Sequence, residues 1–458
     1  MPAKLDLKPR ILYEVAKAAW DGKLYERREE ICKLIEEEFR DKVTRRQVAN
    51  QIRIAMGLNP HDDDSVISDT DTEALMGLGS EPIIVANAAA CRNCSPEERA
   101  CEQACPFGAI SHDKTGRLTI DYSKCLEEGY CIDACSFDAL AEKSQFVPLI
   151  NLLKQQTHHV YASVAPAFAG QFGPDVTPGK LRAALLKLGF TDMTETALYA
   201  DLVTMKEAFE FDSHVKTAAD FLLTSCCCPV WIKLIENKYP QLIDHISPSV
   251  SPMIASARVI KALEPEAKVV FIGPCVAKKS EAQLPDLAGA VDFVLTFQEL
   301  RTIFAAVGIN PAEEPDIESS QASSGGRLYA RTGGVSTAVK TMVERIIPHT
   351  AQRLTPIAVD GIPDCQKILD QLSKGEVTAN FIEGMACKGG CVGGPGRLII
   401  PAKGTEEVNK YSVAAPVETP VDNPNIYAIL TKLGNPQGIP ELTGPGPMSV
   451  LLARDLQK

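Results

Sequence analysis

The chain has 458 residues, 45% of them hydrophobic, with a net charge of −12 at neutral pH and a pI near 5.2. Nucleic acids and anionic membrane surfaces repel an acidic chain, so both classes of partner are disfavoured. No stretch has the apolar length of a membrane span, and the first residues lack the apolar core of a signal peptide, which predicts a cytoplasmic protein. In that reducing compartment, fifteen cysteines indicate metal ligation or redox chemistry rather than disulfides.

The first 60 residues predict a small helical module. In YERREEICKLIEEEF, the apolar residues Ile31, Leu34, Ile35 and Phe39 recur at helical spacing. The segment TRRQVANQIRI could be a nucleic-acid recognition helix, but the mixed charge of residues 1–58, with 13 basic and 10 acidic side chains, favours a solvated face. Residues 61–80 are acidic and have no apolar stripe, which predicts a linker.

A block of seven cysteines follows the linker, in the runs CRNCSPEERACEQACP and CLEEGYCIDAC. A zinc site needs four ligands, so seven thiols exceed that requirement. The spacing resembles that of a bacterial two-cluster ferredoxin, whose C-x2-C-x2-C-x3-C run gives three thiolates to one 4Fe-4S cluster and the last to the other. We therefore expect a ferredoxin-like α+β domain over residues 81–147.

The ferredoxin resemblance implies two ligand sets. Cluster one would be held by Cys91, Cys94, Cys101 and Cys135, and cluster two by Cys105, Cys125 and Cys131. Six residues rather than two separate Cys94 from Cys101, an insertion that a loop absorbs at little cost. Glu128 stands where cluster two should have its fourth cysteine. Three alternatives remain open: Glu128 binds iron through oxygen, the site holds a 3Fe-4S cluster, or a solvent ligand completes it.

From residue 148 onward, short apolar runs alternate with longer helical patterns. The runs HVYASVAP, DFLLTSCC, AKVVFIGPC, VDFVLTF and ANFIEGMAC are typical of buried parallel strands. Three of them end in cysteines, and in open α/β sheets ligands bind at the carboxyl ends of strands. We expect residues 148–458 to form a two-lobed α/β catalytic domain, in which helices flank parallel sheets.

Three motifs in this region carry a specific resemblance. They are TSCCCPVW at residues 224–231, GPCVAKKSE at 273–281 and EGMACKGGCVGGPG at 383–396. In this order, they resemble the TSCCPxW, MPCxxKxxE and ExMACxxGCxxGGG signatures of the iron-only (FeFe) hydrogenases. The resemblance implies an H-cluster, in which one cysteine links a 4Fe-4S cubane to a diiron unit that carries carbon monoxide, cyanide and an azadithiolate bridge.

The resemblance also implies the cubane ligands, which would be Cys228, Cys275, Cys387 and Cys391, with Cys391 as the bridging residue. This chain has three consecutive cysteines where the family has two. Alignment on the following Pro and Trp makes Cys227 the thiol beside the diiron bridge, whereas alignment on TSCC shifts this role to Cys226. We prefer Cys227, because the Pro and Trp fix the turn after the ligand. Cys226 is then structural or an alternative proton donor.

Protons need a route to a buried metal site. Glu207 and Glu210 lie three residues apart on one helical face, and with Ser247 they match the family's proton relay. The expected order from solvent is Glu207, Ser247, Glu210 and then Cys227.

Further residues are implied around the diiron unit. Lys278 would donate a hydrogen bond to a cyanide ligand, and Glu281 would hold that lysine in place. Ala165 and Pro166 match the segment that lines the pocket, and Ser251 and Met385 are expected to complete its wall.

Three positions depart from the typical enzymes, which have Ser, Met and Gln where this chain has Ala167, Gly273 and Met253. They indicate a divergent subgroup. The expected function is hydrogenase activity, with electrons passing through the ferredoxin-like clusters to a ferredoxin or similar carrier, and with dedicated maturation proteins supplying the diiron unit. The alternatives are a hydrogen sensor with the same cluster, and an iron-sulfur assembly protein that lacks the diiron unit.

Overall fold

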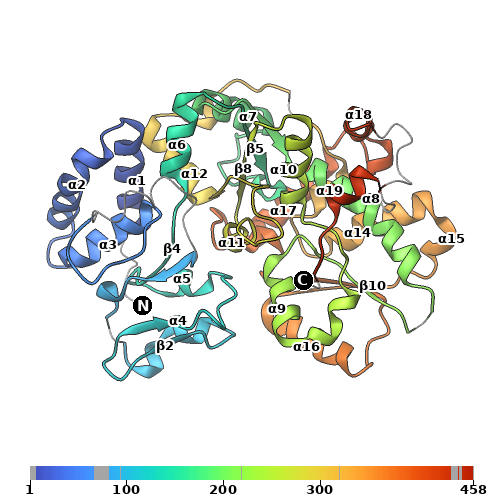
Figure 1. The fold of residues 1–458 in the computed structure, drawn as a ribbon, viewed down its shortest axis with the longest axis horizontal. Helices are drawn as coiled ribbons and strands as arrows, with labels where there is room; N and C mark the ends of the chain where they lie inside the picture. The colour runs from blue at the N-terminus through green and yellow to red at the C-terminus, as the bar shows by residue number, and fades with distance from the viewer. Residues whose placement is uncertain are drawn as a thin grey trace.

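The computed structural model of the chain (Figure 1) describes residues 7–66, 82–92, 94–217, 219–318, 320–434, 442 and 446–456. Most of the expected acidic linker, residues 67–80, lies outside the described residues. Within them, no helix is long and apolar enough to cross a membrane.

The first three helices are α1 (Leu7–Trp20), α2 (Leu24–Glu38) and α3 (Arg45–Ala55). Helix α1 packs against α6 (Phe146–Gln155) and α12 (Phe297–Val307), and it shares one hydrophobic core with the larger α/β part. Every residue of α3 from Gln47 to Ala55 is buried. This helix therefore presents no free face to a nucleic-acid groove.

The cysteine-rich segment folds as two small antiparallel pairs with two short helices. Strand β1 (Ile84–Ala86) pairs with β4 (Leu140–Glu142), and β2 (Ile110–His112) pairs with β3 (Leu118–Ile120). Helices α4 (Ala100–Ala104) and α5 (Tyr130–Ala134) contact each other between these pairs. Figure 1 shows this segment below the first helices.

A four-stranded parallel sheet forms the first lobe of the remaining chain. Its order is β6-β5-β8-β9, comprising β5 (Val160–Val164), β6 (Asp192–Glu195), β8 (Lys268–Gly273) and β9 (Phe293–Thr296). It is packed by α12 together with α7 (Pro178–Leu188), α8 (Thr196–His214) and α10 (Pro252–Leu263).

A three-stranded parallel sheet forms the second lobe. Its order is β10-β11-β7, comprising β7 (Leu222–Leu223), β10 (Pro356–Asp360) and β11 (Phe381–Met385). It is packed by α9 (Pro229–Lys238), α14 (Gly334–Ile346) and α16 (Ile362–Ser373). The other α-helices are α11 (Ala277–Glu281), α13 (Ser324–Leu328), α15 (Pro348–Ala351), α17 (Pro401–Val413), α18 (Pro424–Lys432) and α19 (Pro447–Leu452).

The predicted α/β class with parallel sheets flanked by helices is confirmed. All five apolar runs singled out in the sequence contain strands, namely β5, β7, β8, β9 and β11. In these two sheets the sequence patterns missed β6 and β10, each of which lies at one edge of its sheet.

Candidate active site

Four cysteines converge where the two lobes meet. Cys228 follows β7, Cys275 follows β8, and Cys387 and Cys391 follow β11. Burial raises the pKa of Cys275, Cys387 and Cys391 most, and neighbouring thiols of this set, Cys228 among them, raise each of these pKa values further. Burial and these neighbours raise the pKa of Cys391 to about 12. Because a metal takes the place of the thiol protons, such a set is suited to a metal group with sulfur ligands.

Backbone amides donate to the sulfur of Cys228, and this distinguishes it from Cys226 and Cys227. Its sulfur accepts a hydrogen bond from the amide of Ala386 at 3.5 Å, and the Trp231 amide also faces it. These donors counter the rise in the pKa of Cys228 that burial causes. Cys228 also directly precedes Pro229, the first residue of α9, and the Trp231 indole donates to the Thr224 carbonyl at 3.0 Å. The Pro and Trp therefore fix the turn around Cys228.

A small cavity of about 50 Å³ adjoins these cysteines. Cys227, Lys278 and Cys391 reach its wall, together with Ala165 and Pro166. Apart from Cys391, which is half-buried, these residues are buried. A cysteine of the four-thiol set, Cys391, lies on its wall. The residues thus fit a small metal complex joined to a cubane through Cys391.

Cys226 and Cys227 face different surroundings. Cys227 lines the cavity, whereas Cys226 does not. The Cys226 thiol donates to the Val250 carbonyl at 3.4 Å. Burial raises the pKa of Cys226 most, followed by the charges of Glu207 and Glu210. This arrangement agrees with the alignment that places Cys227 beside the diiron position.

Lys278 lies on the cavity wall with its charge retained. Burial alone would lower the pKa of Lys278, but the Glu281 carboxylate, 2.5 Å from its Nζ, outweighs burial and raises that pKa. Glu281 therefore holds the lysine in place as expected, and a positive donor is available to an anionic ligand in the cavity.

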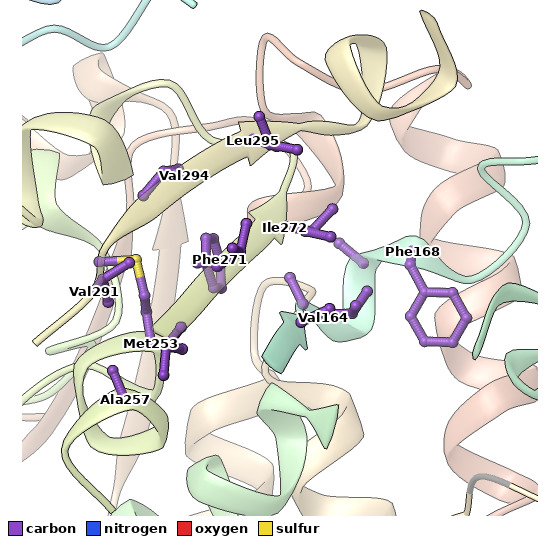
Figure 2. Close-up of a cluster of buried hydrophobic side chains, with 14 of the residues drawn as sticks. Val164, Phe168, Met253, Ala257, Phe271, Ile272, Val291, Val294 and Leu295 are labelled. Atoms are coloured by element: carbon purple, nitrogen blue, oxygen red, sulfur yellow. The ribbon is translucent and has the colours of Figure 1, made fainter. Parts of the chain in front are cut away.

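The three divergent positions shape this cavity. Ala167 and Met253 line it, and Phe271 reaches it from β8. Figure 2 shows Met253 of α10 close to Phe271. Gly273 makes room for that ring, because a Cβ at this position would lie 2.7 Å from the Phe271 ring and 3.2 Å from the Ala165 Cβ. An aromatic ring and a thioether thus stand on the wall of the cavity.

Two expected wall residues lie elsewhere. Ser251 caps α10, because its hydroxyl accepts from the Ile254 amide at 3.4 Å, and Pro252 lines the cavity in its place. Met385 is buried in β11, where it pairs with Asp360 in the parallel ladder. Neither Ser251 nor Met385 lines the cavity, so this expectation is corrected.

The three relay residues are in contact, but in a different order from the expected one. The Ser247 hydroxyl donates to Glu210 at 2.7 Å and also faces Glu207. Glu207 is fully buried and accepts from Thr224 at 2.8 Å, two residues before Cys226. Of the two glutamates, Glu207 has the larger effect on Cys226. These contacts make Glu207 the inner carboxylate and Glu210 the outer one, because Glu207 bonds to the residue two before Cys226 whereas Glu210 bonds to Ser247 and Lys206.

Several residues near the relay carried no sequence signal. Lys206 forms a buried ion pair with Glu210 and donates to Ser249 at 2.9 Å. Tyr329 lines the cavity, and its hydroxyl accepts from Thr204 at 2.9 Å. Burial and then the charge of Glu210 raise the pKa of Glu207 to about 7, against the donation from Thr224. A carboxyl group with such a pKa can exchange a proton near neutrality.

In the ferredoxin-like segment, the thiols gather in two sets. Burial raises the pKa of Cys101 to about 11, with smaller effects from Cys135 and Cys91. Burial and then the charges of Glu128, Cys125, Cys105 and Cys101 raise the pKa of Cys131. Cys94 is half-buried, and its carbonyl oxygen accepts from Arg99 at 3.2 Å. The neighbours of Cys101 belong to the first ligand set that the ferredoxin resemblance implies, and Cys125 and Cys105 belong to the second. Cys101 lies near both sets, and the sulfur of Cys94 has no described contact with the others, so the assignment of ligands stays a prediction.

Tyr130 joins this segment to the four-cysteine site. Its hydroxyl donates to the Ala386 carbonyl at 2.8 Å and lies beside Cys387. Glu128, two residues earlier, also faces Tyr130. Among the described residues, no three His, Cys, Asp or Glu side chains could hold a single metal ion.

Comparison with known proteins defines the class. Residues 158–395 match the family described as iron only hydrogenase large subunit, C-terminal domain, and the chain belongs to this family. Iron hydrogenase 1 of Clostridium pasteurianum is 30% identical, over 67% of this chain and 69% of that protein. A solved FeFe-hydrogenase structure, described in terms of oxygen inactivation at its H cluster, has a TM-score of 0.55 at 25% identity and covers 68% of this chain and 98% of that one.

A second group of relatives has a different description. Cytosolic iron-sulfur assembly component 3 of Pongo abelii is 26% identical, over 59% of this chain and 68% of that protein. The chain is thus similar both to proteins described as hydrogenases and to proteins described as assembly components.

Proposed function

We propose that this chain is a hydrogenase that interconverts dihydrogen with protons and electrons. The observation that carries the proposal is the cavity beside the four cysteines, with Cys227, Lys278 and Cys391 together on its wall. No structural role in a buried wall requires these three groups together. An anionic metal complex can use all of them: a free thiol, an ammonium group and a metal-ligating thiol.

The H-cluster, when bound, would supply the site at which dihydrogen is split or formed. Cys228, Cys275, Cys387 and Cys391 would hold its cubane. Lys278, kept charged by Glu281, would anchor the anionic ligands of the diiron unit.

The proton route follows from the hydrogen bonds of the chain itself. Glu210 would exchange protons with Ser247, and Ser247 with Glu207. Glu207 would pass the proton toward Cys227, the thiol on the cavity wall. The pKa of Glu207, about 7, makes both of its protonation states accessible at neutral pH.

Electrons would travel through the cysteine-rich segment. We propose that residues 81–147 form the electron-transfer domain, residues 148–458 the catalytic domain, residues 1–60 a helical module and residues 61–80 a linker. The contact of Tyr130 with Cys387 supports this route, because it joins the second thiol set to the cubane ligands. A ferredoxin-like carrier would be the external partner, and maturation proteins would deliver the diiron unit in the cytoplasm.

The assembly relatives support one alternative, a scaffold that holds iron-sulfur clusters without a diiron unit. The Glu207–Ser247–Glu210 contacts favour the hydrogenase, since a scaffold has no need of a buried proton route. A hydrogen sensor would share the same site and differ in its turnover.

The test is an infrared spectrum of anaerobic protein produced together with the diiron maturases. Bands in the metal carbonyl and cyanide region that shift under dihydrogen are expected, and a turnover assay then separates enzyme from sensor. The absence of such bands in protein whose cubanes are full would establish the scaffold function instead.

A further inference from the structure

Glu128 occupies an unusual place for a carboxylate. It is 4% exposed. Among the described residues, no cation and no side-chain donor faces its carboxylate, and only its own backbone amide does so. Burying a charge without a partner is costly. Its neighbours are the Cys125 and Cys131 thiols, the Tyr130 hydroxyl and the Glu127 carboxylate, which has the same charge.

The adjacent residue shows what an ordinary glutamate does in the same turn. Glu127 accepts from the Ile83 amide at 3.0 Å and pairs with Lys233 at 3.2 Å. Its carboxylate is thus fully engaged by protein groups. Of two consecutive buried glutamates, one has protein partners and the other is directed at cysteines.

The backbone explains how Glu128 reaches the thiols. Glu127 and Gly129 both adopt positive φ, at 58° and 84°. A Cβ on Gly129 would lie 2.9 Å from Pro395, so the turn packs directly on the glycine-rich motif of the catalytic part. The turn is therefore held in one conformation between the two parts of the chain.

We propose that Glu128 is the fourth ligand of cluster two, binding one iron through a carboxylate oxygen, with Cys105, Cys125 and Cys131 holding the other three. The bond forms between a carboxylate oxygen and iron, and a proton is lost if the carboxyl group was protonated. Bound iron supplies the positive charge that the protein does not provide for this side chain. The cluster is then a 4Fe-4S cluster rather than a 3Fe-4S cluster.

This inference rests on the proposed electron route and adds a consequence to it. Cluster two would lie beside Tyr130, which contacts the cubane ligand Cys387. It would therefore be the last electron-transfer site before the catalytic cubane. An oxygen ligand changes the charge and covalency at one iron, and the reduction potential of a cluster depends on both.

The experiment uses the full chain produced without diiron maturases and reconstituted anaerobically with iron and sulfide, so that its result is independent of hydrogenase activity. The variants are Glu128→Ala, Glu128→Cys and, as the matched control, Glu127→Gln. Protein labelled with 13C-glutamate is reduced and studied by pulsed electron paramagnetic resonance.

We expect a 13C hyperfine coupling at one reduced cluster in the wild type and in Glu127→Gln, and its loss in both Glu128 variants. Glu128→Ala should also lose one iron per chain and gain a 3Fe-4S signal when oxidised, while Glu128→Cys should keep the iron and change the spin signal. A wild type that already shows the 3Fe-4S signal, or a coupling from 17O-labelled water in place of 13C, would overturn the proposal. Intact clusters in Glu127→Gln exclude a general effect of the turn.

Discussion

At the residue scale, the site depends on which way neighbouring side chains point. Cys226 and Cys227 are adjacent in sequence, but the first faces Glu207 and the second faces the cavity. Sequence reasoning identified both thiols and both relay glutamates. It gave the glutamates the wrong order, because their spacing does not say which one the helix turns toward the cysteines.

Replacing Cys227 by Ala should lower hydrogen turnover at least 100-fold, because it removes the thiol on the cavity wall. The infrared bands of the diiron unit should remain, since Cys227 is not among its proposed ligands. Cys226→Ala is the matched variant and should cost less than 10-fold. The reverse ranking in a turnover assay would show that the two roles are exchanged.

Glu207 should make the stability of the protein depend on pH. Its pKa, about 7 in the folded chain, lies above its usual value of 4.5. Between these values the folded chain keeps a proton that the unfolded chain releases, so stability falls as pH rises through this window. The loss approaches about 3 kcal/mol above pH 7.

Glu207→Gln removes this dependence. The melting temperature of the variant, relative to wild type, should therefore be higher at pH 8 than at pH 5. The exposed Glu37→Gln serves as the control and should show no such trend. An equal difference at both pH values would mean that Glu207 titrates in its usual range.

At the element scale, the strands that the sequence revealed are the apolar ones. Strand β6 was missed because its residues are polar: Thr194 and Glu195 are buried by bonds to Gln321 and Arg327, far along the chain. Strand β10 lies at the edge of its sheet and is only partly buried. A local sequence pattern does not predict a strand whose side chains are buried by polar residues far along the chain.

The second element-scale feature is the packing of α9 on β11. A Cβ on Gly384 would lie 2.4 Å from the Trp231 ring. Gly384→Ala should therefore cost about 1–3 kcal/mol through overpacking and should lower the iron content of the cubane, measured by melting and iron analysis. In the double variant with Trp231→Phe, part of both losses should be restored. A double variant no better than Gly384→Ala would show that the strain lies elsewhere.

At the scale of the whole molecule, a buried ion pair joins three parts of the chain. Lys279, on α11, pairs with Glu299 of α12 at 2.8 Å and donates to the Lys143 carbonyl, just after β4. Ser144 donates to the same glutamate at 2.6 Å. The sequence did not predict these contacts. The motif resemblance gives a role to Lys278 and none to the neighbouring Lys279.

Lys279→Met should destabilise the chain by about 3–5 kcal/mol, because it leaves Glu299 buried without its cation. The melting temperature of the whole chain measures this loss. The exposed pair of Lys403 with Glu406 offers the control, and Lys403→Met should leave melting unchanged. Equal melting of both variants and the wild type would show that the buried pair contributes no net stability.

The four cysteines at the junction come from both sheets and from distant parts of the sequence. A cubane bound to them would act as a covalent cross-link that closes very long loops. Closing a loop of about 100 residues by a single bond is worth about 5 kcal/mol in chain-entropy terms. Insertion of the cubane would thus stabilise the tertiary structure as well as build the active site. In a chain that lacks its cubane, proteases should cut between the lobes before they cut within them.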